Sequence, residues 1–213
     1  MRAMTSAELT ASDASLLLAP SRREVAPVRR AVDVIVAVTA LFVLAPICLA
    51  IAAAIALEGG GGVVFRQTRV GKDGRRFRIV KFRTMRAGGT ARAHDVPLRQ
   101  RRDDPRCTRI GRALRQAHLD ELPQLVNVLA GDMTLIGPRP LIPEEDALVN
   151  QVWRERHHAL PGITGAWQVS RSPETDVDEL VRLDRDYLAA RSLRSDVTVL
   201  VRTLGCVARR TGR

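Results

Sequence analysis

The sequence predicts a mostly helical α/β domain with one short β-hairpin, associated with a membrane through a re-entrant N-terminal helix. Three observations support this prediction. Residues 34–57 form an uncharged run of 24 residues, and a helix needs roughly 20 to span a bilayer. Two short runs of β-branched and aromatic residues flank a glycine-containing turn. Most of the later chain repeats apolar residues at helical spacing.

The composition limits the class of protein. A chain of 213 residues is long enough for one domain of ordinary size. Its hydrophobic content of 46% is too high for a disordered chain. The three cysteines lie far apart with no C-x-x-C spacing, which disfavours a disulfide framework and a zinc site.

Basic residues are concentrated in one central segment. Residues 66–115 hold 17 Lys/Arg and 4 Asp/Glu, a local balance of +13 in a chain whose net charge is +11. This indicates either a solvated basic face or an anionic partner such as nucleic acid, an anionic membrane surface or a phosphorylated small molecule. Nucleic acid is not expected, because only Phe77 and Phe82 could stack on bases there and no nucleic-acid-binding module surrounds them.

The first two segments are a tail and a membrane helix. Residues 1–27 are small and polar and predict a disordered tail without a signal peptide. Residues 28–58 follow as the membrane segment, because a helix that is apolar around its whole circumference is seldom a soluble core helix. Pro46 lies at the middle of the uncharged run, where proline kinks or breaks a helix. Each half would then reach about 18 Å, roughly half the hydrocarbon thickness.

Charges at both ends of this segment favour a return to the same membrane face. Five arginines precede the run, and six basic residues follow it within residues 66–78. Cytoplasmic ends carry the excess of Lys and Arg, so both ends are expected to be cytoplasmic. The sequence therefore predicts a re-entrant helix–break–helix, with a kinked full span as the alternative.

Residues 59–213 are predicted to fold as one domain whose last helices are amphipathic. Short strands are expected at Val63–Phe65 and Phe77–Val80, around a turn at 71–74, and residues 87–107 are expected to form a loop. Apolar spacing and helix-end signals predict helices at 109–117, 123–129, 144–157, 176–190 and 195–209. The last of these helices either lies in the membrane interface or packs on the domain.

One acidic pair stands out as a candidate for chemistry. Asp120 and Glu121 directly precede the helix that starts at Pro123, where acidic residues are often only a favourable helix terminus. Here Arg115 lies within about a turn upstream, and a stiff Gly/Pro-rich loop presents Arg139 downstream. Carboxylates that hold Mg²⁺ and arginines that bind phosphate oxygens are what phosphoryl transfer requires. The neighbouring membrane segment indicates a lipid phosphate as one substrate.

Five motifs in order carry a resemblance to a known family. They are Lys-Phe-Arg-Thr-Met at 81–85, Leu-Asp-Glu-Leu-Pro-Gln-Leu at 119–125, Gly-Asp-Met at 131–133, Gly-Pro-Arg-Pro at 137–140 and Pro-Gly-Ile-Thr-Gly at 161–165. The series resembles the bacterial sugar transferase family, the small monotopic phosphoglycosyl transferases, over about residues 29–204. The chain resembles the minimal catalytic form of that family.

The resemblance implies an initiating step of exopolysaccharide or glycoconjugate synthesis at the cytoplasmic face of the bacterial inner membrane. Such enzymes transfer a sugar phosphate from a UDP-sugar to polyprenol phosphate, such as undecaprenyl phosphate, and release UMP. By this resemblance Asp120 is the nucleophile that forms a covalent phosphosugar intermediate. Glu121 assists with deprotonation, and both carboxylates hold the Mg²⁺ cofactor.

The resemblance also implies a set of substrate-binding residues. They are Lys81, Arg83, Arg115, Arg139 and Gln168. The chain departs from the family pattern at two places: Ala45-Pro46 stands where Ser-Pro is frequent, and Ala166-Trp167 stands where Trp-Ala is common. The alternative function is a non-enzymatic basic protein that is anchored in the membrane and binds nucleic acid or anionic lipid.

Overall fold

The computed structural model describes residues 21–59, 61–86, 104–149, 151–170 and 177–208. In chain order the elements are α2 (Ser21–Glu58), β1 (Val64–Val70), the 3₁₀ helix η1 (Lys72–Gly74), β2 (Arg76–Phe82), α3 (Arg109–Gln116), the 3₁₀ helix η3 (Leu119–Glu121), α4 (Gln124–Ala130), β3 (Thr134–Ile136), α5 (Pro143–Leu148), the 3₁₀ helix η4 (Gln151–His158), β4 (Gly162–Thr164), α6 (Ala166–Val169), α7 (Val177–Ala189) and α8 (Leu193–Ala208). The fold is mostly helical with a short β-hairpin, as predicted.

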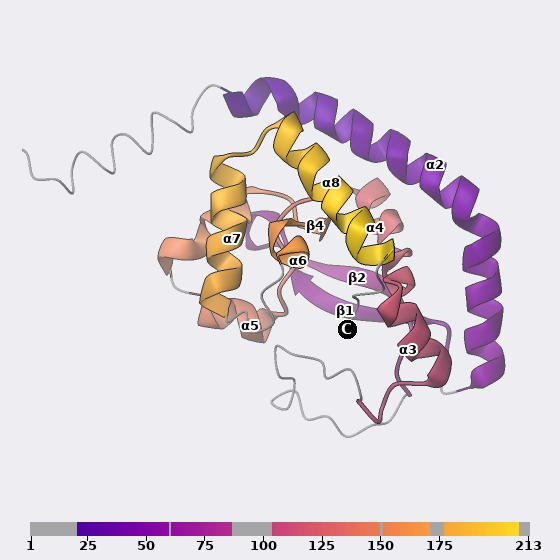
Figure 1. The fold of residues 1–213 in the computed structure, drawn as a ribbon. Helices are drawn as coiled ribbons and strands as arrows, with labels where there is room; N and C mark the ends of the chain where they lie inside the picture. Colours follow the sequence, from indigo (N-terminus) through magenta and orange to yellow (C-terminus); the bar gives the residue numbers. More distant parts are fainter. Residues whose placement is uncertain (1–20, 60, 87–103, 150, 171–176, 209–213) are drawn as a thin grey trace, which may run out of the picture.

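Helix α2 is one continuous helix of 38 residues with Pro46 inside it. The expected break at Pro46 is therefore not an interruption of the helix, and the helix starts at Ser21, earlier than the predicted residue 28. Figure 1 shows instead that α2 curves over the top and down one side of the molecule, with the other elements on its concave side. Bending without a break is one of the two effects that an internal proline has on a helix.

The two faces of α2 differ in what they contact. On the concave face, Ala37 packs with Leu125 and Val128 of α4, and Ile51 and Ile55 belong to a separate core cluster. On the other face large apolar side chains are exposed, among them Ile35, Phe42, Val43 and Leu49. The most apolar part of α2 has a mean hydropathy of 2.9, and only 6% of it is buried in the protein. A soluble core helix would be mostly buried, so this helix is suited to contact lipid.

Both ends of α2 are joined to the folded domain by polar contacts. Near its start, Arg30 donates to the last carbonyl groups of α4, at 2.6 and 3.0 Å. Asp33, which is buried, accepts hydrogen bonds from the Thr134 hydroxyl at 2.6 Å and the Leu135 amide at 3.1 Å. At its end, the Glu58 carboxylate accepts the first two amides of α3, at 2.8 and 3.2 Å. The same domain therefore holds the two ends of the apolar helix.

The hairpin β1–β2 is longer than the sequence predicted, because it extends Val64–Val70 against Arg76–Phe82 in antiparallel register. The turn lies where it was expected, at 71–74. A second pair of strands, β3 and β4, was not predicted. It is parallel, with three residues in each strand, which is too short for a periodic signal. This pair fixes the start of the loop that contains Arg139.

The helices predicted at 109–117, 123–129, 176–190 and 195–209 correspond to α3, α4, α7 and α8. The helix predicted at 144–157 is wrong, since α5 ends at Leu148 and η4 begins at Gln151. At the end of α5 the backbone of Val149 is extended, and its side chain is buried with Leu141, Leu180 and Val181. Burial of Val149 against α7 thus overrides the helical pattern. Of the tail predicted at 1–27, residues 21–27 belong instead to α2, and residues 1–20 lie outside the described residues. Most of the predicted loop, 87–103, also lies outside them.

Candidate active site

The two candidate carboxylates lie on a tight turn between α3 and α4. His118, two residues after the end of α3, adopts the left-handed conformation with φ of 57°, which is uncommon for a residue other than glycine and is often found at functional sites. The chain then forms the 3₁₀ turn η3, which carries Asp120 and Glu121. On β2, Lys81 reaches across 40 positions of sequence, and its ammonium group lies 2.6 Å from Glu121.

The environments of the two carboxylates shift their pKa values in opposite directions. Burial raises the pKa of Asp120, and the negative charge of Glu121 raises it further, against the opposing charges of Lys81 and Arg115. Burial alone would also raise the pKa of Glu121, but Lys81 and Arg139 lower it below its ordinary value. Adjacent carboxylates with diverging pKa values are typical of acid–base and nucleophilic sites.

Of the predicted arginines, the structure brings Arg115 and Arg139 to this turn and directs Arg83 elsewhere. Arg115 is buried, donates to the Cys107 sulfur at 3.0 Å and lies close enough to Asp120 to affect its pKa. Arg83 donates to the carbonyl groups of Gly62 and Val64, at 2.8 and 3.3 Å, at the base of the hairpin. Its guanidinium is thus engaged with the segment that follows α2.

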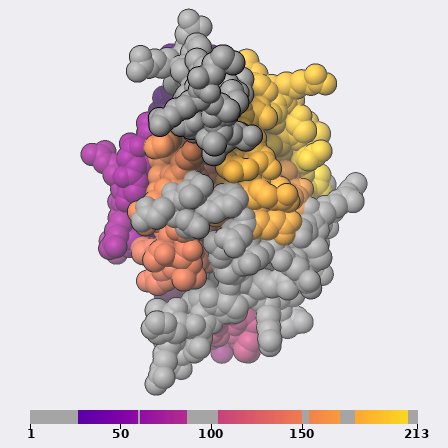
Figure 2. Space-filling view, turned by 90° about the vertical axis from the view of Figure 1, so that its left-hand side faces the viewer, coloured from indigo at the N-terminus to yellow at the C-terminus, as the bar shows by residue number. Residues whose placement is uncertain are grey.

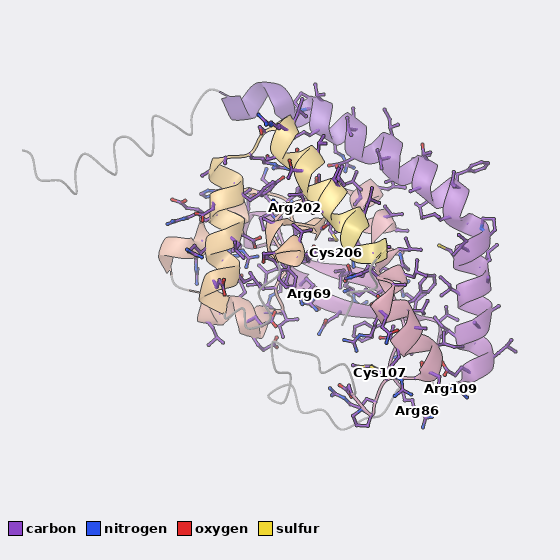
Figure 3. The ribbon with its side chains drawn as sticks, in the orientation of Figure 1. Arg69, Arg86, Cys107, Arg109, Arg202 and Cys206 are labelled. Atoms are coloured by element: carbon purple, nitrogen blue, oxygen red, sulfur yellow. The ribbon has the colours of Figure 1, made fainter. Side chains whose placement is uncertain are left out.

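Arg139 lies next to a second arginine that the sequence analysis did not single out. The Arg139 guanidinium stacks on the ring of Trp167, 4.2 Å from its centroid. Arg69 of β1 is mostly buried, and burial together with the positive charge of Arg139 lowers the pKa of Arg69 to about 10. Figure 3 shows Arg69 in the middle of the fold, near α6. Two guanidinium groups held together beside Glu121 favour the binding of an anion such as phosphate.

An apolar cavity of about 240 Å³ adjoins the carboxylates. Its walls are residues of α2, the η3–α4 segment, β4, α6 and α8. Glu121 and His118 line it on one side, Gln168 lines it from α6, and Leu44 and Cys206 contribute the apolar parts of α2 and α8. Cys206 lies near the C-terminal end of α8 in Figure 3. The predicted residue Gln168 therefore shares a cavity with Glu121.

His118 and Arg69 were missed by the sequence analysis. Spacing does not single out His118, because no other metal-ligating residue lies at a suitable distance from it in the sequence. In the structure His118 affects the pKa values of Asp120 and Glu121, and its Nε2 is buried without a hydrogen-bond partner among the described residues. Its position directly before the Leu-Asp-Glu motif was the available signal. Arg69 had none, because only the tertiary fold places β1 beside the loop at 137–140.

The two carboxylates fit a magnesium ion. Among the described residues no group of three or more His, Cys, Asp or Glu side chains is placed to hold a metal. Mg²⁺ does not need one, because it is usually bound by one or two carboxylates together with waters and substrate phosphates. A cation at Asp120 and Glu121 would also offset the repulsion that raises the pKa of Asp120.

Comparisons with known proteins point to one family. The sequence model of the family described as "Bacterial sugar transferase" matches residues 24–210. The chain is 43% identical over 186 residues to the UDP-glucose:undecaprenyl-phosphate glucose-1-phosphate transferase of Caulobacter vibrioides, across 83% of this chain and 68% of that protein. It is 42% identical over 164 residues to the galactosyl transferase CpsE of Streptococcus agalactiae, across 73% of this chain. It is 32% identical over 191 residues to the exopolysaccharide production protein ExoY of Sinorhizobium fredii, across 84% of each chain.

The extent of these matches differs between relatives. The chain spans 36% of the length of CpsE but 84% of the length of ExoY. The sugars that the names specify also differ, since one relative is named for glucose and another for galactose. The comparisons therefore support the family more strongly than any one sugar.

Proposed function

Since the chain belongs to the bacterial sugar transferase family, we propose that it transfers a sugar phosphate from a UDP-sugar to polyprenol phosphate. The observation that supports this most directly is the position of Asp120 and Glu121. They lie among Lys81, Arg115 and Arg139. Glu121 also lines an apolar cavity that the exposed apolar helix α2 helps to form. A site that joins phosphate-binding cations to an apolar cavity suits a lipid phosphate.

Asp120 is the nucleophile in the proposed first half-reaction. One of its carboxylate oxygens attacks the phosphorus that bears the sugar, and the bond from this phosphorus to the UMP oxygen breaks. UMP leaves with the electron pair, and the phosphosugar remains bound to Asp120. A carboxylate is a weak nucleophile, so Arg115 and Arg139 contribute by binding the phosphate oxygens and reducing the repulsion between anions.

The second half-reaction regenerates the carboxylate. An oxygen of the polyprenol phosphate attacks the same phosphorus, the bond to Asp120 breaks, and the product is a polyprenyl diphosphate sugar. Lys81 keeps Glu121 ionised, so Glu121 can accept the proton of the incoming lipid phosphate. The cavity between α2 and α8 accommodates the first part of the lipid chain, with Gln168 at its wall.

A bound magnesium ion would be held by Asp120 and Glu121. When bound, it would neutralise negative charge on the diphosphate oxygens, and this would favour attack by a carboxylate. Lys81 limits how much negative charge Glu121 presents to the ion. Arg139 and Arg69 lie near each other and near Glu121, where they can bind phosphate oxygens of the substrate.

The protein is proposed to lie in one leaflet, at the cytoplasmic face of the bacterial inner membrane. The support is that Arg30 and Asp33 before the apolar run and Glu58 after it contact the same domain. A straight span would separate these ends by the hydrocarbon thickness, about 30 Å, and leave one of them on the far side.

The reaction is tested with the detergent-solubilised full chain, Mg²⁺, undecaprenyl phosphate and a panel of UDP-sugars. Wild type is expected to release UMP in a lipid-dependent manner, and the Asp120→Asn variant is expected to release none. The matched control is Asp186→Asn on α7, which removes an exposed carboxylate and should leave the rate unchanged. A labelled sugar should stay on wild-type protein when lipid is omitted. Full activity of the Asp120→Asn variant would contradict the proposal.

The membrane arrangement is tested with single cysteines in a protein whose own three cysteines are serine. Val28→Cys and Gly59→Cys lie at exposed positions near the two ends of the apolar run. A membrane-impermeant maleimide should label both in inside-out vesicles and neither in right-side-out vesicles. Labelling of the two positions from opposite sides would establish a full span.

A further inference from the structure

The loop at 138–140 has few backbone groups that could form hydrogen bonds with one another. Pro138 and Pro140 lack an N–H group, so the tripeptide has one amide donor, that of Arg139, and three carbonyl acceptors. Such a loop cannot fix itself by local hydrogen bonds. Its position therefore depends on which groups elsewhere in the fold bind these four atoms.

All four atoms are bound by residues from other elements. The Arg139 amide donates to Asp184 Oδ2 at 3.2 Å, and the Arg139 carbonyl accepts from Arg156 Nη2. The Pro138 carbonyl accepts from the Gly162 amide at 2.9 Å, and the Pro140 carbonyl accepts from Arg69 Nη1 at 3.1 Å. Arg139 itself is thus held on both sides of its Cα by Asp184 and Arg156.

Asp184 and Arg156 form a buried ion pair between two elements that do not carry the catalytic carboxylates. Arg156 Nη2 lies 2.8 Å from Asp184 Oδ2, and the side chains are 3% and 0% exposed. Arg156 belongs to η4 and Asp184 to α7, which pack together. Figure 2 shows the side of the molecule where the segment before residue 160 adjoins α7.

Stability alone does not account for this pair. Arg156 Nε and Nη1 and Asp184 Oδ1 are buried without a hydrogen-bond partner among the described residues, so the pair leaves costly polar groups unsatisfied. Replacing a buried ion pair by apolar residues of similar size is often neutral or stabilising. What the pair does specifically is bind the backbone of Arg139 at both of its polar atoms.

From these contacts we propose that Arg156 and Asp184 are positioning residues for Arg139. They fix the backbone from which the Arg139 guanidinium extends, and stacking on Trp167 at 4.2 Å fixes its direction. The guanidinium is thereby held beside Glu121, where it lowers the pKa of that carboxylate. The inference rests on the proposed transferase reaction, in which Arg139 binds phosphate oxygens of the substrate.

The decisive variant replaces the pair by apolar residues, Arg156→Met together with Asp184→Leu. It should unfold at the same temperature as wild type or higher. Its kcat/KM for the UDP-sugar should fall by about 100-fold, the effect of misplacing a substrate-binding group by about 1 Å. In an Arg139→Ala background the same replacement should cause no further loss, because the group that it positions is absent.

Controls separate positioning from folding. The pair His157–Asp146 also joins η4 to a neighbouring helix, at 2.8 Å, but it does not bind the loop backbone. His157→Leu with Asp146→Leu should therefore retain kcat/KM and show no coupling to Arg139. The Asp184→Asn variant keeps one accepting oxygen, so its activity should stay within about tenfold of wild type.

A readout that does not need activity distinguishes this inference from the proposed function. The Arg139 amide is the one exchangeable backbone amide of residues 138–140, so hydrogen exchange with mass spectrometry reports it directly. It should be protected in wild type and lose protection in the apolar double variant. Retained protection, wild-type kcat/KM in the folded double variant, or an equal loss in the Arg139→Ala background would overturn the proposal.

Discussion

Asp184 should make the stability of this protein depend on pH in an unusual direction. Burial raises the pKa of Asp184 to about 7, although Arg156 and the Arg139 amide favour its charged form. In the unfolded chain the pKa of an aspartic acid is about 4. Between these two values the unfolded state has lost the proton and the folded state keeps it, so folding takes up a proton. The stabilisation is therefore complete below about pH 4 and is lost as the pH rises through about 7.

The size of this effect follows from the linkage relation. Each pH unit well inside the window changes the free energy of unfolding by about 1.4 kcal/mol, and the slope falls to half at the folded-state pKa. Raising the pH from 5 to 7 therefore removes about 2 kcal/mol. The comparison is with the Asp184→Asn variant, which carries no titratable group at this position and retains all others. Subtracting the unfolding free energy of the variant from that of wild type cancels the contributions of the other carboxylates and histidines.

The assay is urea unfolding of both proteins in detergent at pH 5, 6, 7 and 8, followed by circular dichroism. The unfolding free energy of wild type minus that of the variant should fall by about 2 kcal/mol between pH 5 and 7 and become constant above the pKa of Asp184. A difference that is constant with pH would show that burial does not perturb Asp184. A difference that rises with pH would show that Arg156 outweighs burial, so the reasoning would be wrong in sign.

Three further predictions concern single side chains. Lys81→Met should move the acid limb of the kcat/KM–pH profile to higher pH, because Lys81 lowers the pKa of Glu121, and Lys81→Arg should restore it; an unmoved limb would contradict this role. Gly111→Ala should lower the unfolding free energy by about 2 kcal/mol or more, because the new Cβ would lie 2.1 Å from the Thr84 carbonyl oxygen, and a gain in thermal unfolding temperature would refute it. Arg30→Met removes two hydrogen bonds to the end of α4 and should cost about 2 kcal/mol in chemical unfolding, whereas no change would mean that α2 is held by packing alone.

The parts of the fold that depend on local pattern could be predicted. The uncharged run from 34 to 57 predicted a long apolar helix suited to contact lipid, and only 6% of the most apolar part of α2 is buried in the protein. Gly131 follows the apolar run of α4 and closes that helix in the left-handed conformation with φ of 89°, which glycine adopts readily. The pattern failed at Val149, where a contact with α7 ends the helix. Periodicity reports the face of a residue but not the partner that the face will meet.

The candidate site divides in the same way. Asp120 and Glu121 could be identified because they are adjacent in sequence and precede a helix. Lys81 was expected in the site, but its ion pair with Glu121 at 2.6 Å was not predicted. Arg83 was also expected there, but its guanidinium is directed toward the base of the hairpin. Arg69 could not be found from sequence, because nothing near it in the chain indicates that β1 passes beside the Arg139 loop.

The sequence by itself determined the long apolar helix, the acidic pair and the Pro-Arg-Pro loop, because each is a short-range property of residue type and spacing. Only the tertiary structure decided how the loop is held. Arg156 and Asp184 lie 28 positions apart and meet the Arg139 backbone from two different elements. Because of its two prolines, the tripeptide has a single amide, that of Arg139. The local sequence therefore indicates that the loop backbone must find hydrogen-bond partners elsewhere in the fold. Which groups meet that need is decided by long-range packing, where burial and hydrogen bonding between distant segments are set together.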